Sequence, residues 1–177
     1  HRTVFKTSFL NEFFYGIAGL LGMKNTIHMR HSHAGHHGYT VHHDLDLEVV
    51  LPIRWDWNFL LRTFIFDYRS LGVILRNESR WAFRRSREKL LRSEWDQRIF
   101  SEGDVAGIRA LKRFARLTLA FHAMLVALFI LTGNWYLVVL VQLAPFFNNW
   151  YLFLTAWPQH AGMRPDVADW RQNTRTY

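Results

Sequence analysis

Apolar positions at helical spacing open the chain. The residues that recur every three or four positions are Phe9, Leu10, Phe13, Phe14, Ile17, Leu20 and Leu21. This pattern is typical of one face of an α-helix. The run is short for a membrane span, Glu12 interrupts it, and Lys6 and Lys24 flank it. We therefore expect an amphipathic helix that lies at a membrane interface. An amphipathic helix packed on a protein core is the alternative interpretation.

Two uncharged runs dominate the C-terminal half. Residues 117–132 carry no formal charge, and with residues 114–116 they make a helix of roughly 28 Å at 1.5 Å per residue. Residues 135–157 are again uncharged, with aromatic side chains near both ends. Because Gly133 and Asn134 predict a tight turn, the pattern indicates an antiparallel transmembrane hairpin over residues 114–157. Both of its ends would then emerge on one membrane face.

Three polar positions and one proline modify this hairpin. Pro145 should kink the second helix. For His122, Asn148 and Asn149 we favour hydrogen bonds within the helical bundle, although an ionisable group inside a span can also mark a functional site.

Residues 54–116 are strongly basic, with 15 Lys and Arg against 8 Asp and Glu, and so hold most of the net charge of +8. We expect a basic helix over residues 80–92 and a further helix capped by Ser101 or Asp104. Basic charge next to apolar runs indicates the cytoplasmic membrane face rather than nucleic-acid binding. The charge could be a solvated face, or it could contact lipid headgroups or an acidic redox partner.

Histidines crowd residues 24–50. The seven in this region are His28, His31, His33, His36, His37, His42 and His43. On a helix, His33, His36 and His37 share one face at positions i, i+3 and i+4, and converging imidazoles bind zinc, iron, copper or nickel. A surface patch that scavenges metal is the competing interpretation. The chain has no cysteine, so a metal would use histidine or carboxylate.

His160 follows the second apolar run by three residues. Alone it would be an ordinary helix-end residue. The predicted hairpin, however, returns it to the membrane face that carries His33, His36 and His37. We therefore expect it to be a further ligand of the same centre.

At these residues the chain resembles the membrane fatty acid desaturases, which carry three histidine boxes. Residues 33–37 match the second box, H-x-x-H-H, and His1 resembles the last histidine of the first box. His160 resembles the extra histidine that follows the second hairpin. Residues 169–176 resemble the approach to the third box, which would follow Tyr177. In stearoyl-type desaturases an Asn lies one turn before the extra histidine; here Ala156 stands there, so that ligand is not transferred.

The resemblance implies two iron ions held by His1, His33, His36, His37 and His160. It also implies O2 as oxidant, a fatty acyl substrate linked to CoA or lipid, and an electron donor such as a cytochrome b5-like protein or a ferredoxin. Asp44, Asp46 and Glu48 would be carboxylates that orient the ligands, or else a solvated acidic turn. His28, His31, His42 and His43 would be supporting or surface residues.

We therefore expect an all-α integral membrane protein with its active site on the cytoplasmic face. Its parts would be an interfacial helix and histidine boxes (1–50), basic helices (51–113), the transmembrane hairpin (114–157) and a cytoplasmic segment (158–177). Together they would form a single partial desaturase domain, without the start of box 1 and all of box 3, and so inactive alone. A hydroxylase or ketolase of the same superfamily, and a membrane metal-binding or transport protein, are the alternatives.

Overall fold

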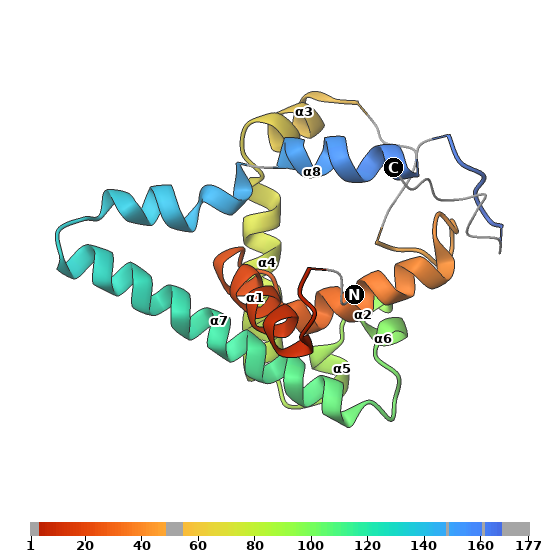
Figure 1. Ribbon diagram of the computed structural model, residues 1–177, viewed down its shortest axis with the longest axis horizontal. Helices are drawn as coiled ribbons and strands as arrows, with labels where there is room; N and C mark the ends of the chain where they lie inside the picture. Colours follow the sequence, from red (N-terminus) through yellow and green to blue (C-terminus); the bar gives the residue numbers. More distant parts are fainter. Residues whose placement is uncertain (1–3, 49–54, 148, 161, 168–177) are drawn as a thin grey trace.

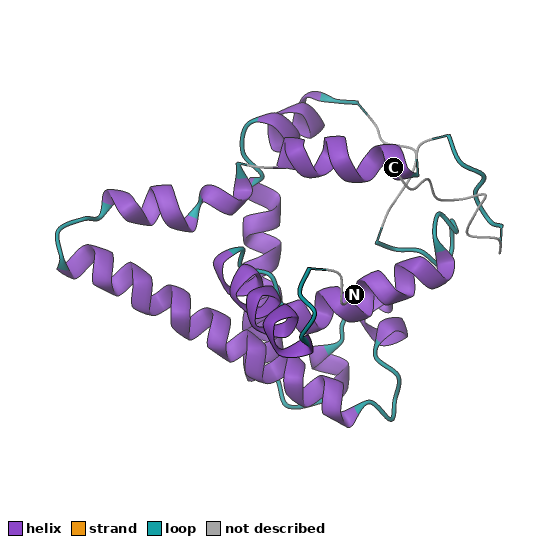
Figure 2. Ribbon diagram, in the orientation of Figure 1, coloured by secondary structure: helices purple, strands orange, loops and turns teal. Residues whose placement is uncertain are grey.

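The computed structural model describes residues 4–48, 55–147, 149–160 and 162–167, and these residues contain helices and loops but no strand (Figures 1 and 2). The predicted all-α class is confirmed for this part of the chain. The longer elements are α1 (Ser8–Leu21), α2 (Thr26–Tyr39), α3 (Trp57–Phe64), α4 (Tyr68–Phe83), α7 (Val105–Leu131) and α8 (Asn149–Ala156). The short ones are α5 (Arg87–Leu90), α6 (Glu94–Ile99), η1 (Val138–Gln142), η2 (Ala144–Phe146) and η3 (Trp157–Gln159).

Side-chain caps begin the three helices on which the fold depends. Asn25 accepts a hydrogen bond from the His28 amide at the start of α2, and Asp67 accepts one from the Ser70 amide at the start of α4. Asp104, predicted as one of two possible caps, accepts one from the Gly107 amide and starts α7. Each cap satisfies an amide that has no partner within its helix, which stabilises the helix by about 1 kcal/mol.

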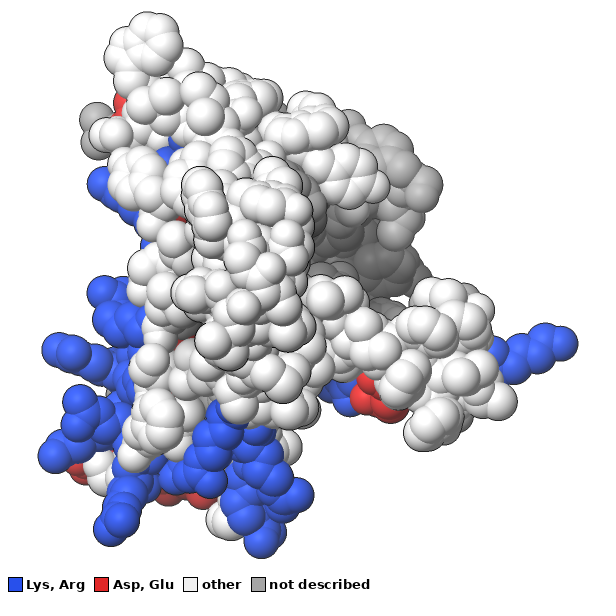
Figure 3. All heavy atoms as spheres, turned by 90° about the vertical axis from the view of Figure 1, so that its left-hand side faces the viewer, with Lys and Arg blue, Asp and Glu red and all other residues white. Residues whose placement is uncertain are grey.

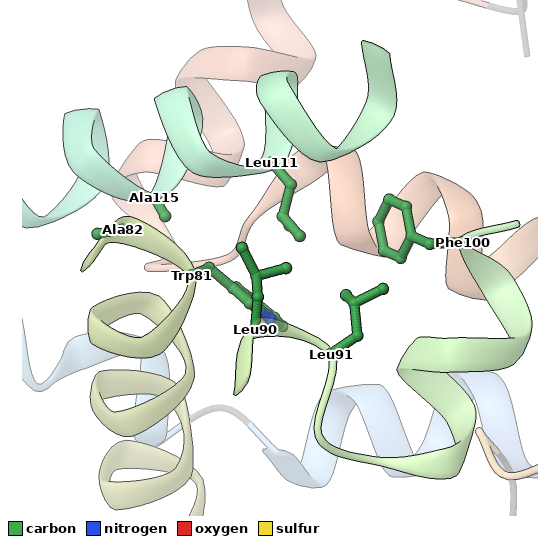
Figure 4. Packing of buried hydrophobic residues seen from close by; sticks show 7 residues of the cluster. All are labelled: Trp81, Ala82, Leu90, Leu91, Phe100, Leu111 and Ala115. Atoms are coloured by element: carbon green, nitrogen blue, oxygen red, sulfur yellow. The ribbon is translucent and has the colours of Figure 1, made fainter. Parts of the chain in front are cut away.

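A small core joins α4, α5 and α7. Figure 4 shows its residues converging from these elements and from the end of α6; they are Trp81, Ala82, Leu90, Leu91, Phe100, Leu111 and Ala115. Phe100, Leu91 and Leu111 have no exposed surface. Truncating a buried Leu or Phe to Ala costs about 2–5 kcal/mol. This core therefore anchors the N-terminal half of α7, against which α2 and α4 also pack.

The basic region is not one helix over residues 80–92, as the charge pattern predicted. α4 ends at Phe83, Arg84 is extended, and a separate short helix begins at Arg87. The break places Leu90 and Leu91 in the core. A continuous helix through residue 92 would place these two leucines away from the core. Their burial therefore outweighs the local helix propensity of the basic segment.

α7 is the one helix in the described part of the chain that is long and apolar enough to cross a membrane, by length and composition. Its most apolar window has a mean hydropathy of 2.0, and only 11% of that window is buried. Exposed apolar side chains along it include Leu117, Met124 and Leu128.

The second apolar run differs from the predicted continuous helix. After a turn at Gly133, which adopts a φ of +75°, η1 returns along α7 (Figure 1). The chain then forms η2, α8 and η3. Pro145 lies in the first turn of η2, and because proline lacks an amide hydrogen it interrupts a regular helix. The predicted kink is thus a full break. Asn149 begins α8 and donates a hydrogen bond to Asp67, whereas Asn148 lies outside the described residues.

Cationic side chains gather on one region of the surface. In Figure 3 most of the Lys and Arg atoms lie below and to the left of the white column that faces the viewer, where α7 and η1 meet. Exposed members contributed by α4, α5 and α7 and the loops between them include Arg76, Arg84, Arg85, Lys89, Arg92, Arg109, Arg113 and Arg116. The charge in the sequence therefore becomes one basic face beside an apolar one.

Candidate metal centre

Helix α2 positions the H-x-x-H-H histidines. The segment is helical from Thr26 to Tyr39, so the helical spacing predicted for residues 33–37 is confirmed. His36 is buried, with 2% of its surface exposed, and His33 and His37 lie on the exposed side of the helix. The Nε2 atoms of His33 and His37 are 3.0 Å apart.

His160 meets this group from the other end of the chain. Its Nε2 atom lies 3.3 Å from Nε2 of His36, across a sequence separation of 124 residues. The two rings are perpendicular with centroids 4.9 Å apart, and His160 is 6% exposed. The His36 ring centroid is also 5.5 Å from that of His37 and 5.9 Å from that of His33. Four imidazoles from α2 and the end of η3 thus form one cluster, which we call the histidine cluster.

The electrostatics of the cluster are visible at His37. Burial, and then the neighbouring imidazoles of His33, His36 and His160, lower the pKa of His37. Adding a proton to one ring becomes harder as other rings approach it. These surroundings favour the neutral form of His37, which is the form that binds metal ions.

The carboxylate of Asp46 contacts the buried His36 on the side of its ring away from His160. Asp46 Oδ2 lies 2.8 Å from Nδ1 of His36 and also accepts the amide hydrogen of Val41. Burial alone would raise the pKa of Asp46, but these hydrogen bonds hold the pKa below its ordinary value. An ionised Asp46 keeps the proton of His36 on Nδ1. The lone pair of Nε2, on the side of His160, is then free to bind a metal.

A second carboxylate stands behind His33. Glu48 Oε1 is 3.5 Å from Nδ1 of His33, and the other carboxylate oxygen accepts a hydrogen bond from Ser32. Trp95 on α6 donates to the Ser32 hydroxyl at 2.8 Å. Of the three acids predicted to orient ligands, Asp46 and Glu48 contact histidines of the cluster, whereas Asp44 offers its backbone carbonyl to Arg98.

The remaining histidines of α2 lie against other elements. His28 Nε2 is 2.9 Å from Asp96 on α6, and its ring stacks on Trp81. His31 Nε2 is 3.1 Å from Asp104, and its Nδ1 is 2.9 Å from the Ile27 carbonyl. Both interactions fit the supporting role expected of these histidines.

His122, His42 and His43 also have polar partners. His122 contacts the Gln142 side chain and the Leu20 carbonyl, as expected for hydrogen bonding between helices. His42 and His43 both contact Asp166, beyond η3. Sequence reasoning missed Asp166 and Trp95, because nothing in their local sequence marks them as neighbours of α2 or of the loop that follows it. It also missed the hydrogen bonds of Ser32, whose partners are Glu48 and Trp95.

Several predicted features lie outside the described residues. They are His1, the side chain of Ala156, and residues 169–176, which were predicted to lead to a third histidine box. The structure therefore describes four of the five predicted ligands.

The donor set of the histidine cluster fits a metal of the iron or zinc type. Two nitrogens that bind one ion at about 2.1 Å in tetrahedral geometry lie roughly 3.4 Å apart, close to the 3.3 Å between His36 and His160. Within the described ranges, no three or more His, Cys, Asp or Glu side chains are already arranged around one ion position. The role of the four histidines as ligands therefore stays a prediction, and their proximity is the structural finding.

The whole chain, residues 1–177, matches the family model of fatty acid desaturases. The chain therefore belongs to the fatty acid desaturase family, as the histidine spacing predicted. No curated protein and no solved structure matches it. Membership implies an oxidoreductase; the family is typically di-iron.

Proposed function

We propose that this protein is an O2-dependent di-iron desaturase that introduces a double bond into a fatty acyl chain. The contact between His36 and His160 carries the proposal, together with the family match. The two Nε2 atoms are 3.3 Å apart, which is close to the spacing of two nitrogen ligands on one ion. Such a pair is explained when both nitrogens serve one ion.

The proposed iron ligands are His33, His36, His37 and His160, with His1 as the fifth. Iron, when bound there, supplies the oxidative chemistry that removal of hydrogen from an unactivated acyl chain requires and that side chains lack. The chain's own contribution is position. Asp46 fixes the tautomer and orientation of His36, and Glu48 with Ser32 and Trp95 orients His33.

We propose that α7 crosses the bilayer and that α1 lies along its surface. α1 exposes Phe9, Phe13 and Leu21, and α7 exposes apolar side chains along its length. The exposed basic face would then lie at the cytoplasmic headgroups and could hold the phosphates of a lipid-linked or CoA-linked substrate. The histidine cluster would lie on the same side, and the chain η1–η2–α8 would complete the membrane hairpin.

Electrons for O2 activation would come from a cytochrome b5-like protein or a ferredoxin. The exposed Lys and Arg side chains of α4, α5 and α7 give such an acidic partner a complementary face. Nucleic acid is not a proposed partner, because the basic face adjoins an apolar surface.

The test is metal analysis and product analysis of the full-length protein purified from membranes. We expect about two irons per chain, as the family resemblance implies, and an unsaturated acyl product formed with O2 and a donor. An added oxygen atom instead of a double bond would identify a hydroxylase or ketolase of the same superfamily. One exchangeable zinc or copper per chain without oxidised product would contradict the proposal and indicate a metal-binding or transport protein.

A further inference from the structure

Asp166 joins the segment that carries His160 to the loop that follows α2. Its Oδ1 atom accepts the amide hydrogen of His43 at 2.8 Å, and its Oδ2 atom lies 2.7 Å from Nδ1 of His43. His42 Nδ1 is 3.1 Å from Oδ1. The carboxylate thus contacts two consecutive residues of the loop after α2, and it lies 123 residues beyond His43 in the sequence.

The loop that Asp166 contacts also carries Asp46, which is the partner of His36. It is folded on itself: the Asp46 amide donates to the His42 carbonyl, and Asp46 accepts the Val41 amide. The amide of His43 points outward to Asp166 instead. Moving this loop would move Asp46, and with it the hydrogen bond that orients His36.

The other end of the link is the segment that carries His160. Asp166 lies six residues beyond that histidine, and the Met163 amide donates to the His160 carbonyl in the intervening turn. Gly162 in this turn has a φ of +72°, and Asp166 itself has a φ of +56°. Asp and Asn enter this region more readily than most side chains, but at some cost. The contacts of the Asp166 carboxylate with His42 and His43 must therefore compensate for the energy of this unfavourable φ.

We propose that Asp166 is a positioning residue that sets the approach of His160 to His36. The proposal rests on the proposed metal role of the histidine cluster. The carboxylate touches no cluster histidine. It acts by holding the loop of Asp46 and the segment of His160 together as one unit. Without it, the His36–His160 pair would have to form from two segments that move separately.

Asp166→Gly is the decisive variant, because glycine adopts the positive φ freely and has no side chain that could contact His42 or His43. Asp166→Asn is the conservative variant, because asparagine tolerates this φ and keeps one side-chain oxygen for the His43 amide. Glu102→Gln, in the exposed turn before α7, is the matched control for removing an exposed negative charge.

Two readouts on the full-length protein test the proposal. Hydrogen exchange in metal-free protein reports the His43 amide, and metal analysis reports iron content and affinity. For Asp166→Gly we expect faster exchange at His43 and iron affinity reduced about tenfold or more, in line with the loss of an outer hydrogen bond at a metal site. Asp166→Asn should restore most of both properties, and Glu102→Gln should match the wild type.

Unchanged exchange at His43 in Asp166→Gly would overturn the proposed link. Faster exchange with wild-type iron affinity would overturn the positioning role. A wild-type protein that binds no iron would instead overturn the proposed function. In that case the exchange measurement, made without metal, still decides whether Asp166 holds the two segments together.

Discussion

Helix α2 carries histidines on two sides, and the two sets differ in what their nitrogens contact. On one side, His28 and His31 point their Nε2 atoms at Asp96 and Asp104. On the other, His36 turns Nδ1 to Asp46 and leaves Nε2 facing another imidazole. One helix with one composition thus supports two different kinds of site.

The difference suggests a rule for the proposed site: the contact of each nitrogen, more than the number of histidines, decides which of them is placed to bind metal. Both ring nitrogens of His31 have protein partners within 3.1 Å, and neither nitrogen faces the histidine cluster. A carboxylate on Nδ1 alone, by contrast, fixes the ring and makes Nε2 the metal-binding atom. The first set ties α2 to α6 and α7, and the second set forms the candidate centre.

The largest expected effect on iron binding comes from replacing His36. His36→Ala in the full-length protein should abolish both iron binding and product, because it removes the buried member that joins His160 to α2. His31→Ala loses the partly exposed pair with Asp104, the contact with the Ile27 carbonyl and the stacking on Phe100. None of these contacts involves the histidine cluster, so the folded variant should keep its iron. Metal analysis and product analysis of the two variants make the check; equal iron contents would show that the two sets do not differ as described.

The second test loosens the other side of α2. Asp96 is buried and contacts both His28 and Arg80; burial alone would raise its pKa, but the bond from His28 and the charge of Arg80 hold the pKa below its ordinary value. Asp96→Asn leaves Arg80 without its counter-charge, so we expect a loss of about 3–5 kcal/mol in the free energy of unfolding.

Denaturant unfolding measures this loss, with the exposed pair of Glu94 and Arg98 as control. Glu94→Gln should cost less than about 1 kcal/mol. The folded fraction of Asp96→Asn should still bind iron. Loss of iron from folded protein would place Asp96 in the metal site instead.

A smaller effect on iron binding is expected from Asp46, the carboxylate that contacts His36. Asp46→Asn keeps the shape of the side chain but removes the charge that fixes the tautomer of His36, and should weaken iron binding about 10- to 100-fold. Competition with a chelator gives the affinity. Asp44→Asn changes an exposed acid two residues away whose backbone, not its carboxylate, contacts Arg98, and should have no effect; a similar loss in both variants would point to general loop charge.

The smallest expected effect is on stability and concerns Glu78, which contacts the N-terminal cap of α2. Burial raises the pKa of Glu78 to about 7 from 4.5, although hydrogen bonds from Asn25, the cap of α2, oppose the shift. The folded protein therefore holds this proton more tightly than the unfolded chain does. The contribution of Glu78 to stability is greatest below pH 4.5 and falls as the pH rises to 7.

Glu78→Gln cannot ionise, so the difference in unfolding free energy between variant and wild type should change by about 2 kcal/mol across that pH range. Thermal or denaturant unfolding at pH 5 and pH 7.5 measures the change. A pH-independent difference would show that Glu78 is ionised in the folded protein throughout.

Local patterns predicted much of the fold. Apolar spacing predicted α1, the histidine spacing predicted a helix at residues 33–37, and Asp104 was recognised as a possible cap of α7. The breaks were predicted less well. α4 stops at Phe83 because Leu90 and Leu91 are needed in the core, and this depends on where α7 lies rather than on residues near the break.

The candidate site was predictable where its residues share a short segment or a family pattern. His33, His36 and His37 follow from helical geometry, and His160 was expected nearby only through the assumed return of the chain. Asp166 and Trp95 could not be found in this way, because a single sequence does not show which distant acid contacts the loop after α2 or which indole packs on α2. The same reason left His28 and His31 without assigned partners until Asp96 and Asp104 were located.

The central claim is that His36 and His160 bind the same iron. X-ray absorption at the iron edge, on full-length wild-type protein and on His160→Gln, tests it directly by counting imidazole ligands per iron alongside iron content. The account predicts fewer imidazoles and less iron in the variant, with α2 still folded. Identical spectra and identical iron content in both proteins would contradict it.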